Sequence, residues 1–306
     1  VKQPASQLFT PERFLRLSIG WLWIFDGFLQ LKPAMFTNAF VQQDLAGNLS
    51  GQPLFVQDLI HYGIGLWSVN DIASSLLAAA FKFGLGLLLV WPSRYAQRIG
   101  IVHTIVWGLT IWVFGEGFGM LLTPVASFAT GSPGSVFFYV LIAFLLLSPH
   151  HDWPQLLRRL LIGLWTAAAL WQARMLFFHP HALLPSLQQN QVVLPFTWMN
   201  QMVNAVMHLS QTHPVLLNAG LTAGFAVFAI LWIFHQTPRA VFIAAGLWWF
   251  VLWAIGMEFG WGATTTDPNA APLWGILLLA QYWSQKSAAS TSLQPNAYRT
   301  SSPASP

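Results

Sequence analysis

Long apolar runs alternate with short polar or turn-rich segments along the whole chain. The runs are bounded by Pro, Gly or charged residues and cover 14–31, 72–91, 99–121, 134–148, 157–178, 214–235, 239–257 and 270–283. A helix needs ~20 apolar residues to cross ~30 Å of hydrocarbon. Since hydrocarbon offers no partner for a free backbone amide or carbonyl, every spanning run must be helical. The pattern predicts an all-α integral membrane protein with about eight transmembrane helices.

Lys82 and Arg174 lie within these runs and Lys32 lies at the edge of an opposite connection, but the other ten basic residues lie in alternate connections or terminal segments. They are Lys2, Arg13, Arg16, Arg94, Arg98, Arg158, Arg159, Arg239, Lys286 and Arg299. The connections 122–133 and 258–269 contain neither Lys nor Arg. Because Lys and Arg accumulate on the cytoplasmic side of a membrane, we expect both termini to be cytoplasmic, in a prokaryotic plasma membrane.

Two weaker segments on the predicted outer side mix apolar and polar residues. Pro53–Trp67 and Pro195–Leu209 each precede the second apolar run of one half of the chain. This mixture is typical of helices that lie at the membrane surface.

The second half of the chain repeats the first. A shift of 141 pairs Trp91 with Trp232, Trp107 with Trp248, Trp112 with Trp253, Gly115 with Gly256 and Phe118 with Phe259. We therefore predict two four-helix repeats, 1–152 and 153–286, followed by a disordered cytoplasmic tail, 287–306. An even number of spans per repeat places both copies in the membrane in the same orientation, which predicts parallel repeats about an axis along the membrane normal.

Composition agrees with a membrane protein and excludes several function classes. Only 7% of residues are charged, whereas 55% are hydrophobic and 15% aromatic, too few charges to cover a water-soluble surface. The net charge of +4 is scattered, so no nucleic-acid partner is expected. The absence of Cys excludes thiolate metal sites and thiol nucleophiles. The expected partner is the lipid bilayer, together with other membrane or redox subunits.

Five charged residues lie in or at the ends of apolar runs, where an ionisable side chain suggests function. They are Asp26, Lys82, Glu116, Arg174 and Glu258. Asp26 and Lys82 are candidates for an intramembrane ion pair. Glu116 and Glu258 lie in matching glycine-rich segments but are offset by one residue, so they would point about 100° apart on a helix. Either they form a functional pair or they close helix ends, and the glycines favour close helix packing.

Histidines suggest a further candidate site on the predicted outer side. The candidate residues are His179, His181, His208 and His213. Together they would offer a copper- or zinc-type imidazole site, unless each is simply a polar residue at the membrane surface.

Tryptophans form rows within the runs, namely Trp21, Trp23, Trp107, Trp112, Trp248, Trp249 and Trp253. These rows suit either packing or a slot for a flat hydrophobic molecule such as a quinone.

The first run resembles the opening helix of the DoxX/DoxD-like family of four-helix membrane units. The resemblance covers residues 16–33, an Arg-x-x-x-Gly element followed by an apolar stretch and a Gly–Lys element, carried by Arg16, Gly20, Gly27 and Lys32. In the second half Arg159 and Gly163 keep the first element, and the Gly–Lys element is absent. The family includes the membrane subunit associated with thiosulfate:quinone oxidoreductase, so the resemblance implies a respiratory, quinone-linked setting and assigns no catalytic residue.

Three functions follow as hypotheses. The first is a non-catalytic or quinone-contacting membrane subunit of a respiratory electron-transfer complex. The second is a small-solute or ion transporter with a path between the two repeats, using Asp26, Glu116 and Glu258. The third is an outward-facing membrane enzyme with a metal site.

Overall fold

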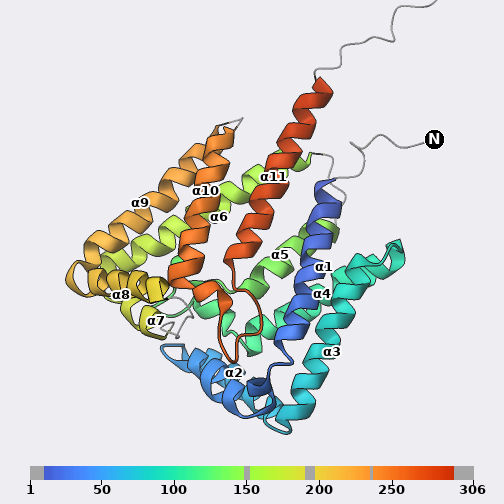
Figure 1. Ribbon diagram of the computed structural model, residues 1–306, viewed down its shortest axis with the longest axis vertical. Helices are drawn as coiled ribbons and strands as arrows, with labels where there is room; N and C mark the ends of the chain where they lie inside the picture. The colour runs from blue at the N-terminus through green and yellow to red at the C-terminus, as the bar shows by residue number, and fades with distance from the viewer. Residues whose placement is uncertain (1–9, 148–151, 190–196, 235–236, 293–306) are drawn as a thin grey trace, which may run out of the picture.

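All regular secondary structure in the described part of the chain is helical (Figure 1). The computed structural model describes residues 10–147, 152–189, 197–234 and 237–292. The α-helices are α1 Pro11–Leu29, α2 Leu54–Trp67, α3 Asp71–Val90, α4 Arg94–Phe114, α5 Ser135–Leu147, α6 Trp153–Phe178, α7 Leu183–Gln189, α8 Thr197–Thr212, α9 Pro214–Ile233, α10 Arg239–Gly256 and α11 Ala271–Ser292. Short 3-10 or π turns occur in the connections, including η3 Val41–Leu45, η5 Phe118–Met120 and η7 Glu258–Gly260.

Five of these helices, α3, α4, α6, α9 and α10, are long and apolar enough to cross a membrane, and α5 is a shorter apolar helix. Many large apolar side chains on their surfaces are exposed, as on Leu77 and Leu170. So many exposed large apolar side chains on long apolar helices indicate a lipid environment. The prediction of an all-helical, multi-pass membrane protein is therefore confirmed at this level. α1 and α11 also coincide with predicted apolar runs.

Local sequence signals set where several helices begin. The Asn70 side chain accepts a hydrogen bond from the Ala73 amide at 3.0 Å at the start of α3. The Asp152 side chain accepts one from the Gln155 amide at 3.0 Å at the start of α6. Such N-caps satisfy backbone donors that have no partner within the helix. Both weaker outer segments are also helical where they are described, as α2 and α8.

Two helix boundaries differ from the predictions. The third apolar run was expected to continue to residue 121, but α4 ends at Phe114. Gly117 and Gly119 then take positive φ angles of 51° and 59°, a conformation that cannot continue a right-handed helix. α11 continues to Ser292, past the start predicted for the tail, and residues 293–306 lie outside the described residues.

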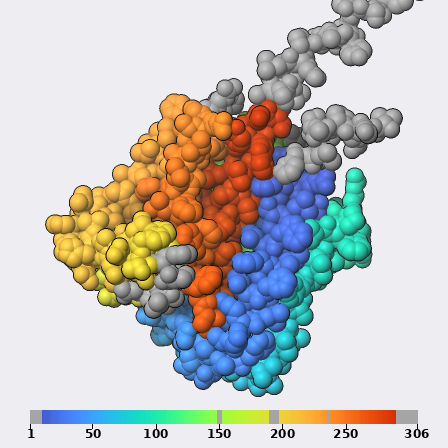
Figure 2. All heavy atoms as spheres, viewed as in Figure 1, coloured from blue at the N-terminus to red at the C-terminus, as the bar shows by residue number. Residues whose placement is uncertain are grey.

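The first two apolar helices of each half pack against one another, α1 with α3 and α6 with α9. α1 also lies beside α11 (Figures 1 and 2), where the Phe14 and Trp283 rings meet edge-on at 4.6 Å. This contact joins the beginning of the first half to the end of the second. The N-terminal end of α1 and the C-terminal end of α11 lie at the same end of the molecule.

Two members of the predicted tryptophan rows lie in the core, beside other tryptophans. Trp249 stacks on Trp274 with ring centroids 4.3 Å apart, and Trp165 lies 5.0 Å from Trp274. Trp23 and Trp249 are buried. The packing interpretation of the aromatic rows is confirmed for these two residues.

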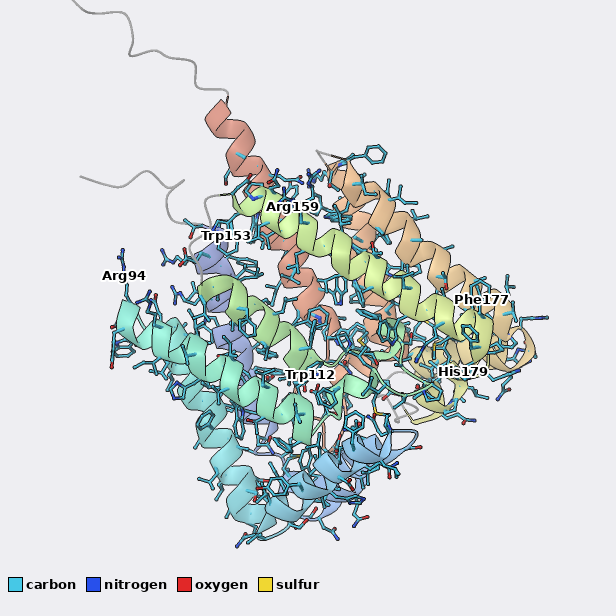
Figure 3. All side chains as sticks on the ribbon, turned by 180° about the vertical axis from the view of Figure 1, so that it is seen from behind. Arg94, Trp112, Trp153, Arg159, Phe177 and His179 are labelled. Carbon is cyan, nitrogen blue, oxygen red and sulfur yellow. The ribbon has the colours of Figure 1, made fainter. Side chains whose placement is uncertain are left out.

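The sides of the molecule can be followed along α4 and α6. In Figure 3, Arg94 and Arg159 lie near the beginnings of these helices, and Trp112 and His179 lie at their opposite ends. Three segments lie near the Trp112 end of α4 (Figures 1 and 3). They are the connection after α4, the beginning of α5 and the segment before α11.

Close packing of α1 on α3 gives a stability prediction. A Cβ atom added at Gly86 would lie 2.5 Å from Ile24 Cγ1 and 2.6 Å from the Gly20 carbonyl oxygen. We expect Gly86→Ala to lower the free energy of unfolding by about 1–3 kcal/mol, the usual cost of overpacking. Thermal unfolding in detergent measures this.

Gly84→Ala on the same helix is the matched control, because an added Cβ there meets nothing within 4 Å. It should leave the unfolding temperature unchanged or raise it, since Ala favours helix over Gly by about 1 kcal/mol. Equal effects of the two substitutions would contradict the proposed close approach of α1 and α3.

Candidate functional site

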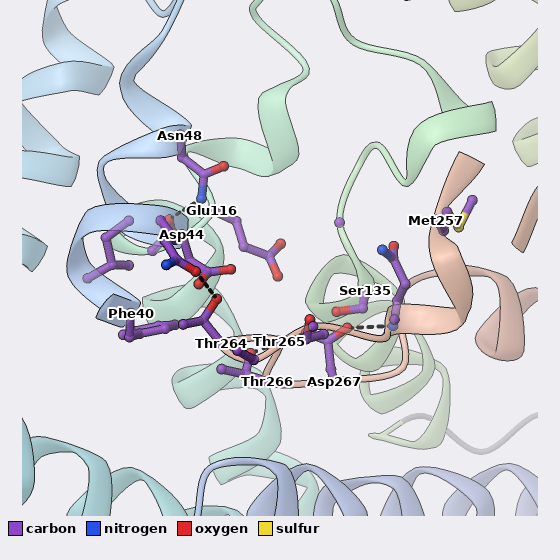
Figure 4. Close-up of a pocket in the computed structure, with 18 of the residues that line it drawn as sticks. Phe40, Asp44, Asn48, Glu116, Ser135, Met257, Thr264, Thr265, Thr266 and Asp267 are labelled. Atoms are coloured by element: carbon purple, nitrogen blue, oxygen red, sulfur yellow. Dashed lines mark hydrogen bonds between the residues drawn. The ribbon is translucent and has the colours of Figure 1, made fainter. Parts of the chain in front are cut away.

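A cavity of about 640 Å³ lies where segments from both predicted halves meet. Residues near η3, the end of α4 and the start of α5 form its first-half walls. The connection between α10 and α11, from Met257 to Asn269, forms the other walls. We call this space the polar cavity (Figure 4).

Four carboxyl side chains line the polar cavity, two from each predicted half. Asp44 and Glu116 come from the first half, and Glu258 and Asp267 from the second. In Figure 4 the Glu116 carboxyl extends into the space between Asp44 on one side and Ser135 and Asp267 on the other. Glu116 and Glu258 thus share one cavity, although their offset of one residue would point them apart on continuous helices.

Burial alters the chemistry of the Glu116 carboxyl. It raises the pKa of Glu116 well above its ordinary value, and the charge of Asp267 raises that pKa further. The charge of Lys82 and a hydrogen bond from the Val136 backbone act in the opposite direction. Glu116 Oε2 is buried and has no hydrogen-bond partner. A carboxyl in this position favours a proton or a cationic ligand.

Asp44 is placed in a similar environment on the opposite wall. Burial raises the pKa of Asp44, while the Thr264 hydroxyl and the Lys32 charge act against that rise. Lys32 lies nearby and donates from Nζ to the Gly262 carbonyl oxygen. Burial lowers the pKa of Lys32.

Glycine-rich segments at the ends of α4 and α10 shape the polar cavity through turns. Gly117, Phe118 and Gly119 have φ angles of 51°, 60° and 59°. The corresponding residues at a shift of 141, Glu258, Phe259 and Gly260, have φ angles of 48°, 56° and 65°. Positive φ is unfavourable for residues other than glycine and is concentrated at functional sites. Gly117 lies outside a regular α-helix but still permits a close approach to α2, where an added Cβ would lie 2.8 Å from Ile60 Cδ1, whereas Gly119 approaches the Pro133 backbone and no helix.

The matched tryptophans hold these turns in the same way. Trp112 Nε1 donates to the Pro133 carbonyl at 2.8 Å, and Trp253 Nε1 donates to the Pro268 carbonyl at 2.7 Å. The Trp112 ring meets Phe118 edge-on at 5.2 Å, and the Trp253 ring meets Phe259 edge-on at 4.7 Å. Both turns thus have the same conformation and the same support.

A second cavity, of about 400 Å³, lies between α2, α3 and α4. Its lining is mostly apolar and includes Tyr62, Leu66, Trp67, Leu77, Trp107 and Phe114. Gln30 and Lys82 are polar residues in this lining. We call this space the apolar cavity. It shares Phe40, Leu45, Ile111, Gly115 and Thr266 with the polar cavity.

The predicted ion pair between Asp26 and Lys82 is replaced by separate hydrogen bonds. Lys82 Nζ donates to Gln30 Oε1 at 3.0 Å and to the Thr266 carbonyl at 3.2 Å. Asp26 Oδ2 accepts from the Tyr139 hydroxyl at 2.7 Å. The two charges are close enough to interact electrostatically, but Asp26 lines neither cavity.

The remaining sequence candidates lie away from both cavities. Arg174 Nη2 donates to the Thr123 carbonyl at 2.7 Å, and the guanidinium lies 5.8 Å from the centre of the Trp171 ring. Arg174 therefore joins α6 to the connection after α4. Among the described residues, no group of three or more His, Cys, Asp or Glu side chains is arranged to hold a metal ion. The proposed site at His179, His181, His208 and His213 is not formed there.

Several residues of the two cavities were not singled out from the sequence. Asp44 and Asp267 lie in polar connections, where an acidic residue is unremarkable. Gln30 lies four residues after Asp26, about one helical turn, so both side chains point to the same side of α1. Since Asp26 was expected to face Lys82, this spacing was the one sequence signal that Gln30 also lies near Lys82. Ser135 gave no signal, because only the fold brings the start of α5 to the cavity.

The chain matches no protein-family model, and no significant similarity was found to a curated protein or to a solved structure.

The raised pKa of Glu116 predicts how stability depends on pH. A carboxyl with a higher pKa in the folded state binds more protons when folded, so it stabilises the fold at low pH and loses this contribution as pH rises above the ordinary glutamate range. We expect Glu116→Gln to raise the unfolding temperature at pH 8 by a few degrees. The difference should shrink towards pH 4.5.

Glu12→Gln is the matched control, because Glu12 is exposed at the start of α1. Unfolding temperatures of the two variants and the parent protein in detergent between pH 4.5 and 8 make the comparison. An effect of Glu116→Gln that grows towards acid pH would contradict the assignment.

Proposed function

We propose that the chain forms eight transmembrane helices in two parallel four-helix repeats, with both termini cytoplasmic. Each predicted apolar run coincides with a helix. The matched turns after α4 and α10 support the duplication, because Trp112 and Phe118 meet edge-on, as do Trp253 and Phe259, their counterparts at a shift of 141. On this topology both cavities lie towards the outer side, because their linings include Ile111 and Gly115 at the end of α4, opposite Arg94 at its beginning.

We further propose that the protein binds a small positively charged solute in the polar cavity and carries it along a path between the repeats. The observation that supports this function is that Glu116 and Glu258, from equivalent segments of the two halves, line one cavity together with Asp44 and Asp267. A site between repeats is typical of transporters whose halves move relative to one another.

The shape of the polar cavity favours an organic cation over a bare metal ion. Its volume of about 640 Å³ lies within the usual range for small-molecule sites, about 300–1,000 Å³. The carboxyls are spread over its walls and do not form a metal-binding group among the described residues. Hydroxyls of Thr265 and Ser135 lie in the same lining and suit a ligand that carries several polar groups.

A positive ligand would also relieve the electrostatic cost of the site. Buried carboxyls near one another repel, and an opposite charge within a few ångströms stabilises their ionised forms. Asp44 Oδ2 and Glu116 Oε2 are both buried without hydrogen-bond partners. An ammonium group has three donors and is suited to contact such oxygens.

The transport function predicts a requirement for both glutamates. With 1,4-diaminobutane as the probe, we expect Glu116→Gln and Glu258→Gln each to weaken binding about tenfold or more, because each removes a charge-assisted contact. Isothermal titration calorimetry measures binding to the purified chain, and uptake of the labelled diamine into proteoliposomes measures transport.

Asp58→Asn is the control for this experiment. Asp58 is exposed on α2 and lies outside the polar cavity. Its substitution should leave binding and uptake unchanged. Binding that is insensitive to both glutamate substitutions would exclude the polar cavity as the solute site.

The apolar cavity favours a second candidate function, the quinone-contacting membrane subunit of a respiratory complex. Trp67 and Trp107 in its lining offer flat surfaces to a quinone ring, and Lys82 and Gln30 offer hydrogen bonds to a quinone carbonyl. The resemblance of residues 16–33 to the DoxX/DoxD-like family supports the same function.

A short-chain quinone tests this second candidate. Decylubiquinone should quench tryptophan fluorescence of the purified chain, and Lys82→Met should weaken the effect, whereas Lys286→Met at an exposed position of α11 should not. Binding by a quinone would not depend on Glu116, which distinguishes it from occupation of the polar cavity.

A further inference from the structure

The apolar cavity opens towards the region that lipid would occupy. Tyr62 on α2 is 60% exposed and Leu77 on α3 is 71% exposed, and both line this cavity. α3 is long and apolar enough to cross a membrane, so Leu77 faces hydrocarbon, whereas Tyr62 lies on the predicted surface helix α2, at the edge of the hydrocarbon. A hydrophobic chain could therefore enter between α2 and α3 directly from the bilayer.

Two buried polar side chains also line the apolar cavity. Lys82 is 4% exposed and uses two of its three donors, on Gln30 Oε1 and the Thr266 carbonyl. The third donor of an ammonium group is available to a ligand. Gln30 is 2% exposed, and its Nε2 has no hydrogen-bond partner. A buried donor without a partner costs about 1–3 kcal/mol, so a bound acceptor would stabilise this arrangement.

The polar cavity adjoins the apolar cavity. Phe40, Ile111 and Thr266 belong to both linings, and Lys82 contacts one of these shared residues through the Thr266 carbonyl. The polar cavity is lined in turn by the carboxyls of Asp44 and Glu116, each with one buried oxygen that lacks a partner. Ser135 Oγ, on a side chain that is 3% exposed, also lacks a partner in the same lining.

Apolar, positive and negative surfaces thus follow one another from the lipid-facing side to the polar cavity. A zwitterionic phospholipid presents the complementary order, because its hydrocarbon chain is followed by a negative phosphate and then by a positive ammonium group. Charge complementarity of this kind determines specificity and orientation.

We propose that the ligand is a phospholipid or lysophospholipid with an aminoethyl phosphate head group, bound across both cavities. Its chain would occupy the apolar cavity, its phosphate would accept hydrogen bonds from Lys82 and Gln30, and its ammonium group would lie among Asp44, Glu116 and Ser135. This inference rests on the proposed function, since it names the substrate class of the polar cavity.

Ligands that lack one of the three parts should bind less well. A lysophospholipid with a glycerol head group has the chain and the phosphate but no ammonium. A long-chain amine has no phosphate for Lys82, and free phosphoethanolamine has no chain. Loss of any one part removes contacts to one of the three surfaces.

The test uses the full chain in detergent micelles and native mass spectrometry. Lysophosphatidylethanolamine is compared with lysophosphatidylglycerol of the same chain length, with dodecylamine and with phosphoethanolamine. Lysophosphatidylethanolamine should bind at least about tenfold more tightly than each of the other three, the factor expected for loss of a charge-assisted hydrogen bond.

Separate substitutions test the phosphate contact in the apolar cavity and the ammonium contact in the polar cavity. Lys82→Met should weaken binding of both lysophospholipids about tenfold or more. Glu116→Gln should weaken binding of lysophosphatidylethanolamine alone, because lysophosphatidylglycerol has no ammonium group. Lys286→Met and Glu12→Gln carry the same chemical changes at exposed positions and should have no effect. Gln30→Met gives a second test of the phosphate contact if Lys82→Met does not fold.

The outcomes separate this inference from the proposed function. If phosphoethanolamine or 1,4-diaminobutane binds as tightly as lysophosphatidylethanolamine and depends on Glu116, the polar cavity takes a free solute and the lipid inference is wrong. If the two lysophospholipids bind equally and Glu116→Gln affects neither, the ammonium position is wrong. If nothing that carries an ammonium group binds, both proposals fail.

Discussion

Burial of Lys82 within α3 is the constraint on which the arrangement of both cavities depends. A lysine in a membrane-spanning helix is costly unless its ammonium group has polar partners. Lys82 finds one directly after α1, the Gln30 amide oxygen, and another in the connection before α11, the Thr266 carbonyl. These contacts fix a segment of the second half against two helices of the first. The same segment then supplies Asp267 to the polar cavity.

The helices form a scaffold, and the polar chemistry lies in the turns between them. Trp112 and Trp253 each donate a hydrogen bond to a proline carbonyl in the connection that follows their helix. Glycine at position 119 is required by space, because an added Cβ would lie 1.8 Å from the Pro133 carbonyl oxygen. Glu258 and Phe259 adopt positive φ without being glycine. An unfavourable backbone conformation persists only where many surrounding contacts hold it in place. Such conformations are common at functional sites.

Aromatic residues serve two purposes in this fold. Trp165, Trp249 and Trp274 stack in the centre of the second half and form a core. Trp67 and Trp107 line the apolar cavity instead. Whether a tryptophan packs in the core or lines a cavity depends on neighbours that are distant in the chain. The first group faces a packed helix, and the second faces an open space. Sequence periodicity carries no information about which neighbour is present.

The sequence by itself determined the helical membrane class and the positions of the apolar helices, and it singled out Lys82, Glu116 and Glu258 as candidate site residues. These conclusions follow from properties that can be judged locally. They are the length of an apolar run compared with the thickness of the hydrocarbon, the need of backbone amides and carbonyls for partners, and the cost of burying a charge. Only the tertiary structure decided that α4 stops at Phe114, that Lys82 pairs with Gln30 and not with Asp26, and that Asp44 and Asp267 join the two glutamates. Each of these outcomes depends on contacts between segments far apart in the chain, where ordinary loop residues become lining residues of a cavity.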